Sequence, residues 1–102
     1  MKVSVALAAY NGEKYIEEQL VSILRQLRSD DEVIVSDDNP GGETEHIVRT
    51  MAASDGRIHY FKGPGKGVIK NFEYAVSKTT GDIIFLSDLI RTMYGCLTRF
   101  VP

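Results

Sequence analysis

The chain alternates between continuous apolar runs and apolar stripes at helical spacing. Residues 3–9 form a nearly unbroken apolar run rich in valine, which is typical of a strand covered on both faces in a parallel sheet. Asn11 and Gly12 mark a turn at its end. Apolar residues then recur every three or four positions, which predicts an amphipathic helix over residues 12–27. Glutamates early in that helix and arginines late in it complement the helix dipole.

The same alternation continues through most of the chain. Residues 32–36, 57–61 and 82–86 have the composition of strands, while residues 44–53 and 66–78 carry the apolar stripes of helices. Segments rich in Gly, Asp, Asn and Pro separate them. Strands that alternate with helices in this way predict an α/β fold, with right-handed crossovers and a mainly parallel, four-stranded sheet that has helices on both faces.

Composition narrows the class of protein without identifying a function. The 102 residues suffice for one small domain, and the net charge of −2 gives no electrostatic basis for binding nucleic acid. The single cysteine, Cys96, rules out an internal disulfide and fits a reducing compartment. No apolar run approaches the roughly 20 residues of a membrane span, and the apolar start ends in a polar turn, unlike a signal peptide. We therefore expect a cytoplasmic protein.

Polar side chains gather where the predicted strands end. Because ligands bind beyond the carboxyl ends of the strands in open α/β sheets, these positions form the candidate site. The first strand leads to Ala8, Ala9, Tyr10 and Asn11, the second to Asp37, Asp38 and Asn39, the third to a loop with Lys62, Lys66 and Lys70, and the fourth to Ser87 and Asp88.

In combination, these residue types match a nucleotide diphosphate. A carboxylate after the second strand can accept the ring N–H of a pyrimidine or a ribose hydroxyl, and an aromatic ring after the first strand can stack on the base. A carboxylate after the fourth strand can hold the ribose or a divalent cation that bridges a diphosphate. Lysines on the loop can offset the remaining phosphate charge. The G-x-G-x-x-G pattern of dinucleotide sites is absent.

Each of these features alone also has an ordinary structural explanation. Paired acids after a strand often only accept backbone N–H bonds in a turn, and a single Tyr10 is more often a packing residue. The GPGKG segment lacks the spacing of a P-loop. His46 and His59 lack the spacing of metal ligands. The combination of residues, and no single one of them, therefore favours a ligand site.

Three segments resemble the amino-terminal half of family 2 glycosyltransferases. They are VSVALAAYNGEKYIEEQLVSILRQ, DEVIVSDDNPGGETEHIV and IHYFKGPGKGVIKNFEYAVSKTTGDIIFLSD, and the resemblance covers about residues 2–88. It implies a transferase with a GT-A fold, whose Rossmann-like half binds a nucleotide sugar, as in bacterial polysaccharide biosynthesis. We expect the strand order 3-2-1-4. Residues 1–88 are accordingly assigned to the nucleotide-sugar-binding half-domain and residues 89–102 to a tail outside the family.

The resemblance assigns roles to residues that recognise the nucleoside. Ala8 and Tyr10 match positions that line the nucleobase pocket, and Asp38 matches the residue that bonds a uracil-type ring. Asp37 matches a more structural neighbour, and it is retained as a nucleotide-binding candidate because it belongs to the same strand end.

The remaining candidates concern the phosphates and a cation. Lys66 and Lys70 belong to the segment from Lys66 to Asn71, which matches one that passes beside the nucleotide in the family. Asp88 matches the first acid of its D-x-D motif, which contacts the ribose or the metal. The second acid, which would coordinate Mn²⁺ or Mg²⁺ directly, is replaced here by Ile90, a residue without an oxygen ligand. The cation expected for the full-length family should therefore bind this chain weakly or not at all.

The resemblance ends at Asp88. The acceptor-binding half of the family and its general base lie beyond the matching segment, so no catalytic residue can be assigned. Residues 89–102 contain no acidic residue and follow neither regular period. We expect a frameshifted, otherwise altered or truncated ending, with a diverged but genuine short protein as the alternative. The chain is accordingly predicted to be an incomplete, inactive form.

These expectations define a function and its rivals. The full-length form would transfer a sugar from a nucleotide diphosphate donor, first of all a UDP-sugar, to a hydroxyl acceptor, and peripheral membrane association stays open for it. The sheet edge left at the last strand favours a homodimer. The alternative is a non-catalytic nucleotide-binding or interaction module. A phospho-receiver domain is disfavoured, because its acid pair would follow the first strand.

Overall fold

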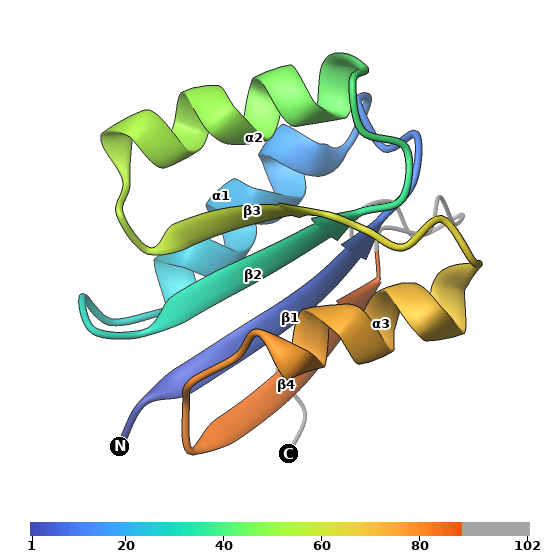
Figure 1. Ribbon diagram of the computed structural model, residues 1–102. Coiled ribbons are helices and arrows are strands. Elements are labelled where there is room, and N and C mark those ends of the chain that lie inside the picture. The colour runs from blue at the N-terminus through green and yellow to red at the C-terminus, as the bar shows by residue number, and fades with distance from the viewer. Residues whose placement is uncertain (89–102) are drawn as a thin grey trace.

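The centre of the molecule is a parallel sheet. The computed structural model describes residues 1–88, apart from the side chain of Asp88. These residues form four strands, β1 (Val3–Ala9), β2 (Glu32–Asp37), β3 (Ile58–Lys62) and β4 (Ile83–Asp88). Their order is β3-β2-β1-β4, and every neighbouring pair is parallel (Figure 1). The predicted α/β class and strand order are therefore confirmed.

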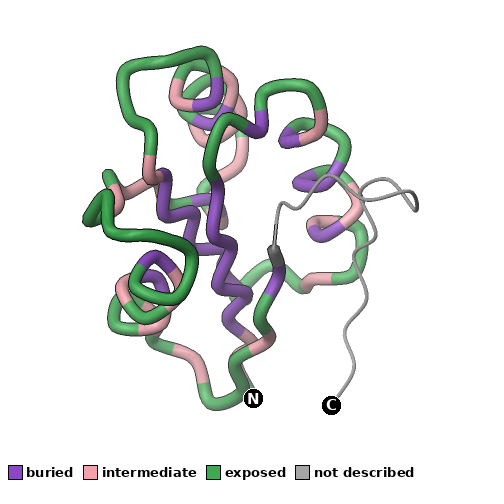
Figure 2. Tube along the Cα trace, turned by 90° about the vertical axis from the view of Figure 1, so that its right-hand side faces the viewer, coloured by how far each residue is buried: buried purple, intermediate pink, exposed green. Residues whose placement is uncertain are grey.

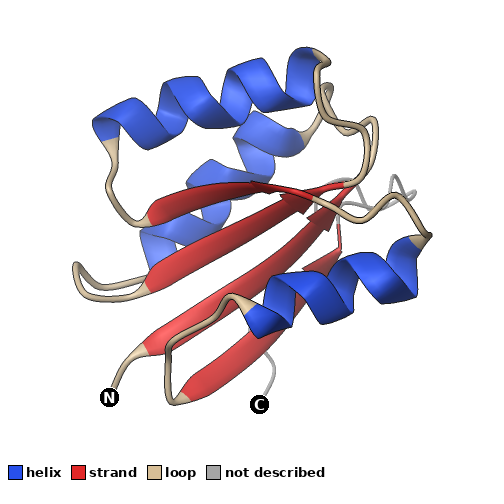
Figure 3. Ribbon diagram, viewed as in Figure 1, coloured by secondary structure: helices blue, strands red, loops and turns tan. Residues whose placement is uncertain are grey.

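Three helices of the described region cover both faces of the sheet, as predicted. They are α1 (Ile16–Gln26), α2 (Glu43–Ser54) and α3 (Val68–Ser77). Helices α1 and α2 pack on one face, and α3 packs on the other face against β1 and β2 (Figures 1 and 3). No helix within residues 1–88 has both the length and the apolar character that a membrane span requires.

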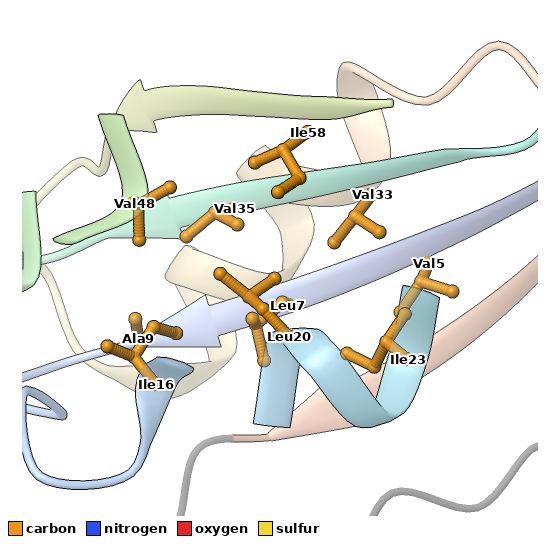
Figure 4. Close-up of a cluster of buried hydrophobic side chains, with 10 residues drawn as sticks. All are labelled: Val5, Leu7, Ala9, Ile16, Leu20, Ile23, Val33, Val35, Val48 and Ile58. Carbon is orange, nitrogen blue, oxygen red and sulfur yellow. The ribbon is translucent and has the colours of Figure 1, made fainter. Parts of the chain in front are cut away.

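The main hydrophobic core lies between the sheet and helices α1 and α2. Its buried members are Val5, Leu7, Ala9, Ile16, Leu20, Ile23, Val33, Val35, Val48 and Ile58 (Figure 4). A smaller cluster on the other face joins Ala6, Ile34 and Ala75. Strand β1 is therefore buried on both faces (Figure 2), which explains its unbroken apolar run. Each fully buried Leu or Ile stabilises the fold by about 1.5–3 kcal/mol.

Two helices begin later than the predicted bounds of residues 12–27 and 66–78, at Ile16 and Val68. Helix α1 begins at Ile16 because the chain first turns at Asn11, whose φ is 50°. The N–H groups of Tyr15 and Ile16 both donate to Gly12 O, at 3.0 and 2.9 Å. Helix α3 begins after Gly67, whose φ of 95° is a left-handed conformation that the regular helix cannot contain.

Two buried carboxylates hold the amino end of the sheet. Glu32 Oε2 accepts hydrogen bonds from Ser4 Oγ at 2.7 Å and from the N–H of Thr80 at 2.6 Å, while Lys2 Nζ lies 3.4 Å from Oε1. Burial alone would raise the pKa of Glu32, but the hydrogen bonds from Ser4 and Thr80 outweigh it and lower the pKa. The ionised carboxylate therefore links β2, β1 and the turn before β4.

Asp31 fastens a second part of the same end. Its Oδ1 accepts the N–H of Val3 at 2.8 Å, and its Oδ2 accepts the N–H of Arg28 at 2.7 Å. Burial opposes ionisation here too, but the two backbone hydrogen bonds bring the net pKa of Asp31 below its usual value. Asp31 thus joins the start of β1 to the loop that follows α1.

The turn into β4 requires a glycine. The N–H of Gly81 donates to Ser4 Oγ at 2.8 Å, and the N–H of Asp82 donates to Lys2 O at 2.8 Å. A β-carbon on Gly81 would lie 2.5 Å from Ser4 Oγ and 2.9 Å from Lys2 O. It would also lie 2.9 Å from Ser4 N, a backbone atom of β1, so a larger residue would push the turn away from that strand.

Strand β4 forms an edge of the described sheet and carries exposed apolar side chains. Ile84 and Leu86 are 41% and 62% exposed. They pair in register with Ser4 and Ala6, so they lie on the same face as α3. Because α3 packs on β1 and β2, it leaves this part of the face uncovered.

Candidate functional site

The carboxyl ends of β1, β2 and β4 meet at one edge of the sheet. Ala9 pairs with Asp37 and Ala8 pairs with Asp88, so the ends of the three strands lie side by side. The N–H of Asp38 donates to Ala9 O at 2.9 Å and fixes the loop after β2 against the end of β1. Figure 1 shows this edge at the arrowheads of the strands, away from the N-terminus.

The loop after β1 presents an aromatic ring. Tyr10 follows the strand directly, and its side chain is 64% exposed, so the ring is available to stack on a planar ligand. Beside it, Nδ2 of Asn39 donates to Oδ1 of Asn11 and links the loops after β1 and β2. Ala8 is only 3% exposed, so its side chain contributes little to the accessible surface.

Asp37 is completely buried, and both of its oxygens have partners inside the protein. Oδ2 accepts the hydroxyl of Tyr60 at 2.7 Å, and Oδ1 accepts the N–H of Asn39 at 3.0 Å. Burial, and then the hydrogen bond to Asp37, raise the pKa of Tyr60 far above its usual value, so its phenol stays a donor at neutral pH. These contacts favour a structural role for Asp37 in shaping the turn.

Asp38 is half-buried and differs from its neighbour in its partners. Its Oδ1 accepts the N–H of Gly65 at 2.8 Å, which ties the loop between β3 and α3 to the end of β2. Within residues 1–88, no residue donates a hydrogen bond to Oδ2. The carboxylate is thus anchored through one oxygen and retains the other for an external N–H or O–H donor.

The two predicted lysines are exposed on the segment between β3 and the first turns of α3. Lys70 Nζ lies 3.4 Å from Glu73 Oε1, in a pair whose side chains are both more than half exposed. Such a surface pair contributes little to stability and exchanges readily with other partners. Among the described residues, neither Lys66 nor Lys70 forms an ion pair with the acids of the strand ends. Both therefore remain available to an anion.

Two residues outside the predicted set of site residues hold this edge together, and the first of them, Asn71, ends the segment that the family resemblance placed beside the nucleotide. Asn71 of α3 is 1% exposed; its Nδ2 donates to Ala9 O at 3.2 Å, and its Oδ1 accepts the hydroxyl of Ser36. Gly63, which follows β3 directly, donates its N–H to the last carbonyl of β2 at 2.7 Å. Asn71 shares a buried helical stripe with Ala75. A polar residue on such a stripe is the sequence signal that would have indicated it.

The predicted metal ligand cannot be placed fully. Asp88 has its backbone in β4, but its side chain lies outside the described residues, as does the whole of Ile90. The described part of the chain contains no group of three His, Cys, Asp or Glu side chains that could hold a metal ion. A cation site on this chain would therefore depend on Asp88, and it stays a prediction.

A surface hollow lies at the opposite, amino end of the sheet, and Asp30, Asp55 and Arg57 line part of it. Arg57 pairs with Asp55 at 2.7 Å, and its Nη1 donates to Leu24 O and Leu27 O at 3.2 and 3.1 Å. The guanidinium therefore has internal partners, and it satisfies carbonyl groups at the carboxyl end of α1. The hollow contains none of the predicted site residues.

The fold and the polar edge define an α/β protein of the kind whose ligands bind beyond the carboxyl ends of parallel strands. Comparison with known proteins then identifies the family. The model described as Glycosyl transferase family 2 matches residues 4–89, and the chain belongs to this family. The predicted resemblance to this family is thereby confirmed.

Curated relatives include glycosyltransferases from bacteria and an archaeon. The GalNAc(5)-diNAcBac-PP-undecaprenol beta-1,3-glucosyltransferase of Campylobacter jejuni is 31% identical, over 98% of this chain and 33% of its own length. The dTDP-rhamnosyl transferase RfbG of Shigella flexneri is 31% identical, over 89% of this chain and 36% of its own. An uncharacterized glycosyltransferase of Methanocaldococcus jannaschii is 35% identical, over 84% and 31%. The chain thus spans about a third of the length of these relatives.

Proposed function

We propose that this chain is the donor-binding part of a glycosyltransferase whose complete form transfers a sugar from a nucleotide diphosphate to a hydroxyl acceptor. Membership of family 2 supports the reaction class. The names of two relatives, a glucosyltransferase and a dTDP-rhamnosyl transferase, agree with sugar transfer and, in one case, with a pyrimidine nucleotide donor.

The observation that carries the proposal is the contrast between the two neighbouring acids. Asp37 is buried with both oxygens satisfied, whereas Asp38 keeps Oδ2 without a partner from the described residues. A carboxylate oxygen accepts the N3–H of uracil or thymine. Tyr10, exposed at the adjacent strand end, would stack on the same base. We therefore assign base recognition to Tyr10 and Asp38, with a UDP-sugar as the first donor to test.

The diphosphate would lie toward the lysines and the end of β4. Lys66 and Lys70 would offset the phosphate charge, and Asp88 would contact the ribose or a cation. Mn²⁺ or Mg²⁺, when bound, would neutralise charge that develops on the leaving diphosphate. One carboxylate is a poor site for either ion, so the cation should strengthen nucleotide binding to this chain only slightly.

Transfer also requires an acceptor site and a base that deprotonates the acceptor hydroxyl. None of the proposed site residues of this chain is assigned to that role. The 102-residue polypeptide should therefore bind nucleotide weakly and transfer no sugar by itself. Robust transfer from UDP-sugars by the purified chain would overturn this part of the proposal.

Calorimetric or NMR titration with UDP, with and without Mn²⁺, tests the donor site. Asp38→Ala should weaken UDP binding by at least about tenfold, the value of a hydrogen bond to a charged group. Asp30→Ala removes an exposed carboxylate at the other end of the sheet and should leave UDP affinity unchanged. Equal UDP affinity in the wild type and Asp38→Ala would contradict the assignment.

A non-catalytic module is the second candidate. An interaction module with the same fold would bind no UDP, and Asp38→Ala would have no effect on its partners. A nucleotide-binding module would lose UDP affinity in Asp38→Ala just as an enzyme would. A sugar-transfer assay on a longer form that includes this segment would distinguish the two.

The exposed edge of β4 supports a homodimer as the proposed assembly. Ile84 and Leu86 are exposed on this edge strand, and such an edge can pair with that of a second copy. Sedimentation at increasing concentration should show a dimer; a monomer at high concentration would contradict it.

The undecaprenol in the name of the Campylobacter relative supports peripheral membrane association of the full-length form, which liposome co-sedimentation tests. The cytoplasm is the proposed compartment.

A further inference from the structure

The carboxylate of Asp38 is confined by a glycine outside the predicted site. A β-carbon built on Gly63 would lie 2.5 Å from Asp38 Oδ1 and 2.6 Å from Asn71 Oδ1, closer than β-carbons approach other atoms in proteins. The backbone of Gly63 cannot easily retreat, because its N–H donates to Asp37 O at 2.7 Å. The absence of a side chain at Gly63 therefore leaves room for the carboxylate of Asp38 in its observed position. Any larger residue at position 63 would displace that carboxylate.

Asn71 of α3 fixes the backbone on which this carboxylate is carried. Its Nδ2 donates to Ala9 O, the same carbonyl that accepts the N–H of Asp38 at 2.9 Å. Because a carbonyl can only accept, the amide nitrogen of Asn71 must face Ala9, and its oxygen then faces Ser36 and Gly63. One buried side chain thus fixes helix α3 to the ends of both strands that carry the proposed base-binding residues.

We infer that Gly63 and Asn71 are positioning residues for base recognition, which hold the carboxylate of Asp38 so that its second oxygen meets the ring N–H. The inference rests on the proposed function, since it assigns a task to the same site. A carboxylate that is already fixed loses less conformational freedom when the nucleotide binds. Displacing it should therefore weaken the contact with the ring N–H and leave contacts to the ribose and phosphates intact.

The test compares UDP with N3-methyl-UDP, which lacks the ring N–H donor, by NMR titration of the whole chain. Wild-type protein should prefer UDP by about tenfold, the value of one charge-assisted hydrogen bond. Gly63→Ala should reduce this preference severalfold, with the affinity for N3-methyl-UDP unchanged. Gly56→Ala is the matched control, because a β-carbon there meets nothing within 4 Å and φ is not positive; it should retain the preference.

Asn71 is tested in the same way, with a milder variant beside it. Asn71→Ala should reduce the preference for UDP, and Ser36→Ala, which removes only the hydroxyl that bonds Asn71, should reduce it less. Ser4→Ala serves as a control that removes buried hydrogen bonds at the amino end of the sheet and should retain the preference. Amide hydrogen exchange of Gly65 gives a readout without ligand, since its bond to Asp38 should open more often in Gly63→Ala.

The outcomes separate the two levels of the argument. Equal binding of UDP and N3-methyl-UDP to wild-type protein would overturn base recognition by Asp38, and the inference with it. A wild-type preference that survives unchanged in Gly63→Ala and in Ser36→Ala would overturn the inference alone. An equal loss of affinity for both nucleotides would show that these residues act only through the general integrity of the fold, which would also overturn it.

Discussion

Acidic side chains lie at both ends of the parallel sheet, but the two ends use them differently. At the amino end, Asp31 and Glu32 are each only 5% exposed, and both oxygens of each accept hydrogen bonds from within the chain. At the carboxyl end, Asp38 is half-buried and anchored through one oxygen. Residue type alone does not distinguish the two kinds of carboxylate; the number of oxygens with internal partners does.

This difference indicates that substitutions of acids at the amino end should change the stability of the fold, whereas substitution of Asp38 should change ligand binding. A carboxylate with all its partners inside stabilises the fold, and its removal leaves donors buried without an acceptor. A carboxylate with a spare oxygen costs little to replace in the unliganded protein. Asp37 shows that both kinds occur next to each other, because it lies at the binding end and yet has only internal partners.

Replacing Glu32 should give the largest change in stability. Glu32→Ala leaves Ser4 and the N–H of Thr80 without their acceptor in a buried environment, which should lower the free energy of unfolding by about 3 kcal/mol. Urea denaturation measures this change. Under folding conditions, the affinity for UDP should be the same as in wild-type protein. A loss of UDP affinity without a loss of stability would break the proposed division between the ends.

Gly81→Ala should have the next largest effect, again on stability alone. The added β-carbon would meet Ser4 Oγ at 2.5 Å and two backbone atoms, Lys2 O and Ser4 N, at 2.9 Å, so the turn before β4 must shift, at a cost of about 2 kcal/mol. Thermal unfolding measures it. The same substitution at Gly56, which has open space, should change stability by less than about 0.5 kcal/mol. Equal effects of the two substitutions would contradict the described packing.

Acid should remove part of the stability contributed by the amino end. The pKa values of Glu32 and Asp31 are lowered in the folded state from ordinary values of 4.5 and 3.8. Their stabilisation is complete above those ordinary values and is lost as the pH falls through the lower, folded values. The free energy of unfolding should therefore decrease below about pH 4.5. Glu32→Gln should weaken this dependence, and an unchanged pH profile in that variant would contradict it.

Asp38→Asn should have the smallest effect on stability, and it tests the carboxyl end of the sheet as Glu32→Ala tests the amino end. The amide oxygen of asparagine can still accept the N–H of Gly65, so stability should change by less than about 0.5 kcal/mol. Its NH₂ group would then face the nucleotide, where it repels a ring N–H and donates to the ring nitrogen of cytosine. The ratio of UDP to CDP affinity should fall. A destabilisation as large as that of Glu32→Ala would show that Asp38 is structural.

Much of the fold could be predicted from the sequence, because burial on both faces leaves a simple pattern. The unbroken apolar run of β1 predicts the central strand, and its bounds, Val3–Ala9, are those of the prediction. Helix starts were less accurate: the apolar stripe does not reveal the left-handed conformations of Asn11 and Gly67. The strand order came from the family resemblance, since periodicity carries no information about which strands are neighbours.

The candidate site was predictable only in part. That Tyr10 and Asp38 each follow a strand can be predicted from the alternation of strands and helices. That the two strands are neighbours came with the strand order, from the family resemblance. The contrast between Asp37 and Asp38 depends on Tyr60 and Gly65, which belong to other segments. No local pattern links these residues, and the same holds for the contacts of Gly63 and Asn71. The nucleotide-binding roles themselves stay predictions until ligands are tested.

The fastening of the first strand to the turn before the last one has a consequence for synthesis. Ser4 receives the N–H of Gly81 across 77 positions of the chain, and Lys2 is bonded to Asp82 across 80. During synthesis, almost the whole described sequence must therefore be made before β1 can pair with β4, its second neighbouring strand. Until then one side of this very apolar strand presents unpaired backbone, with which an exposed strand of another chain can pair.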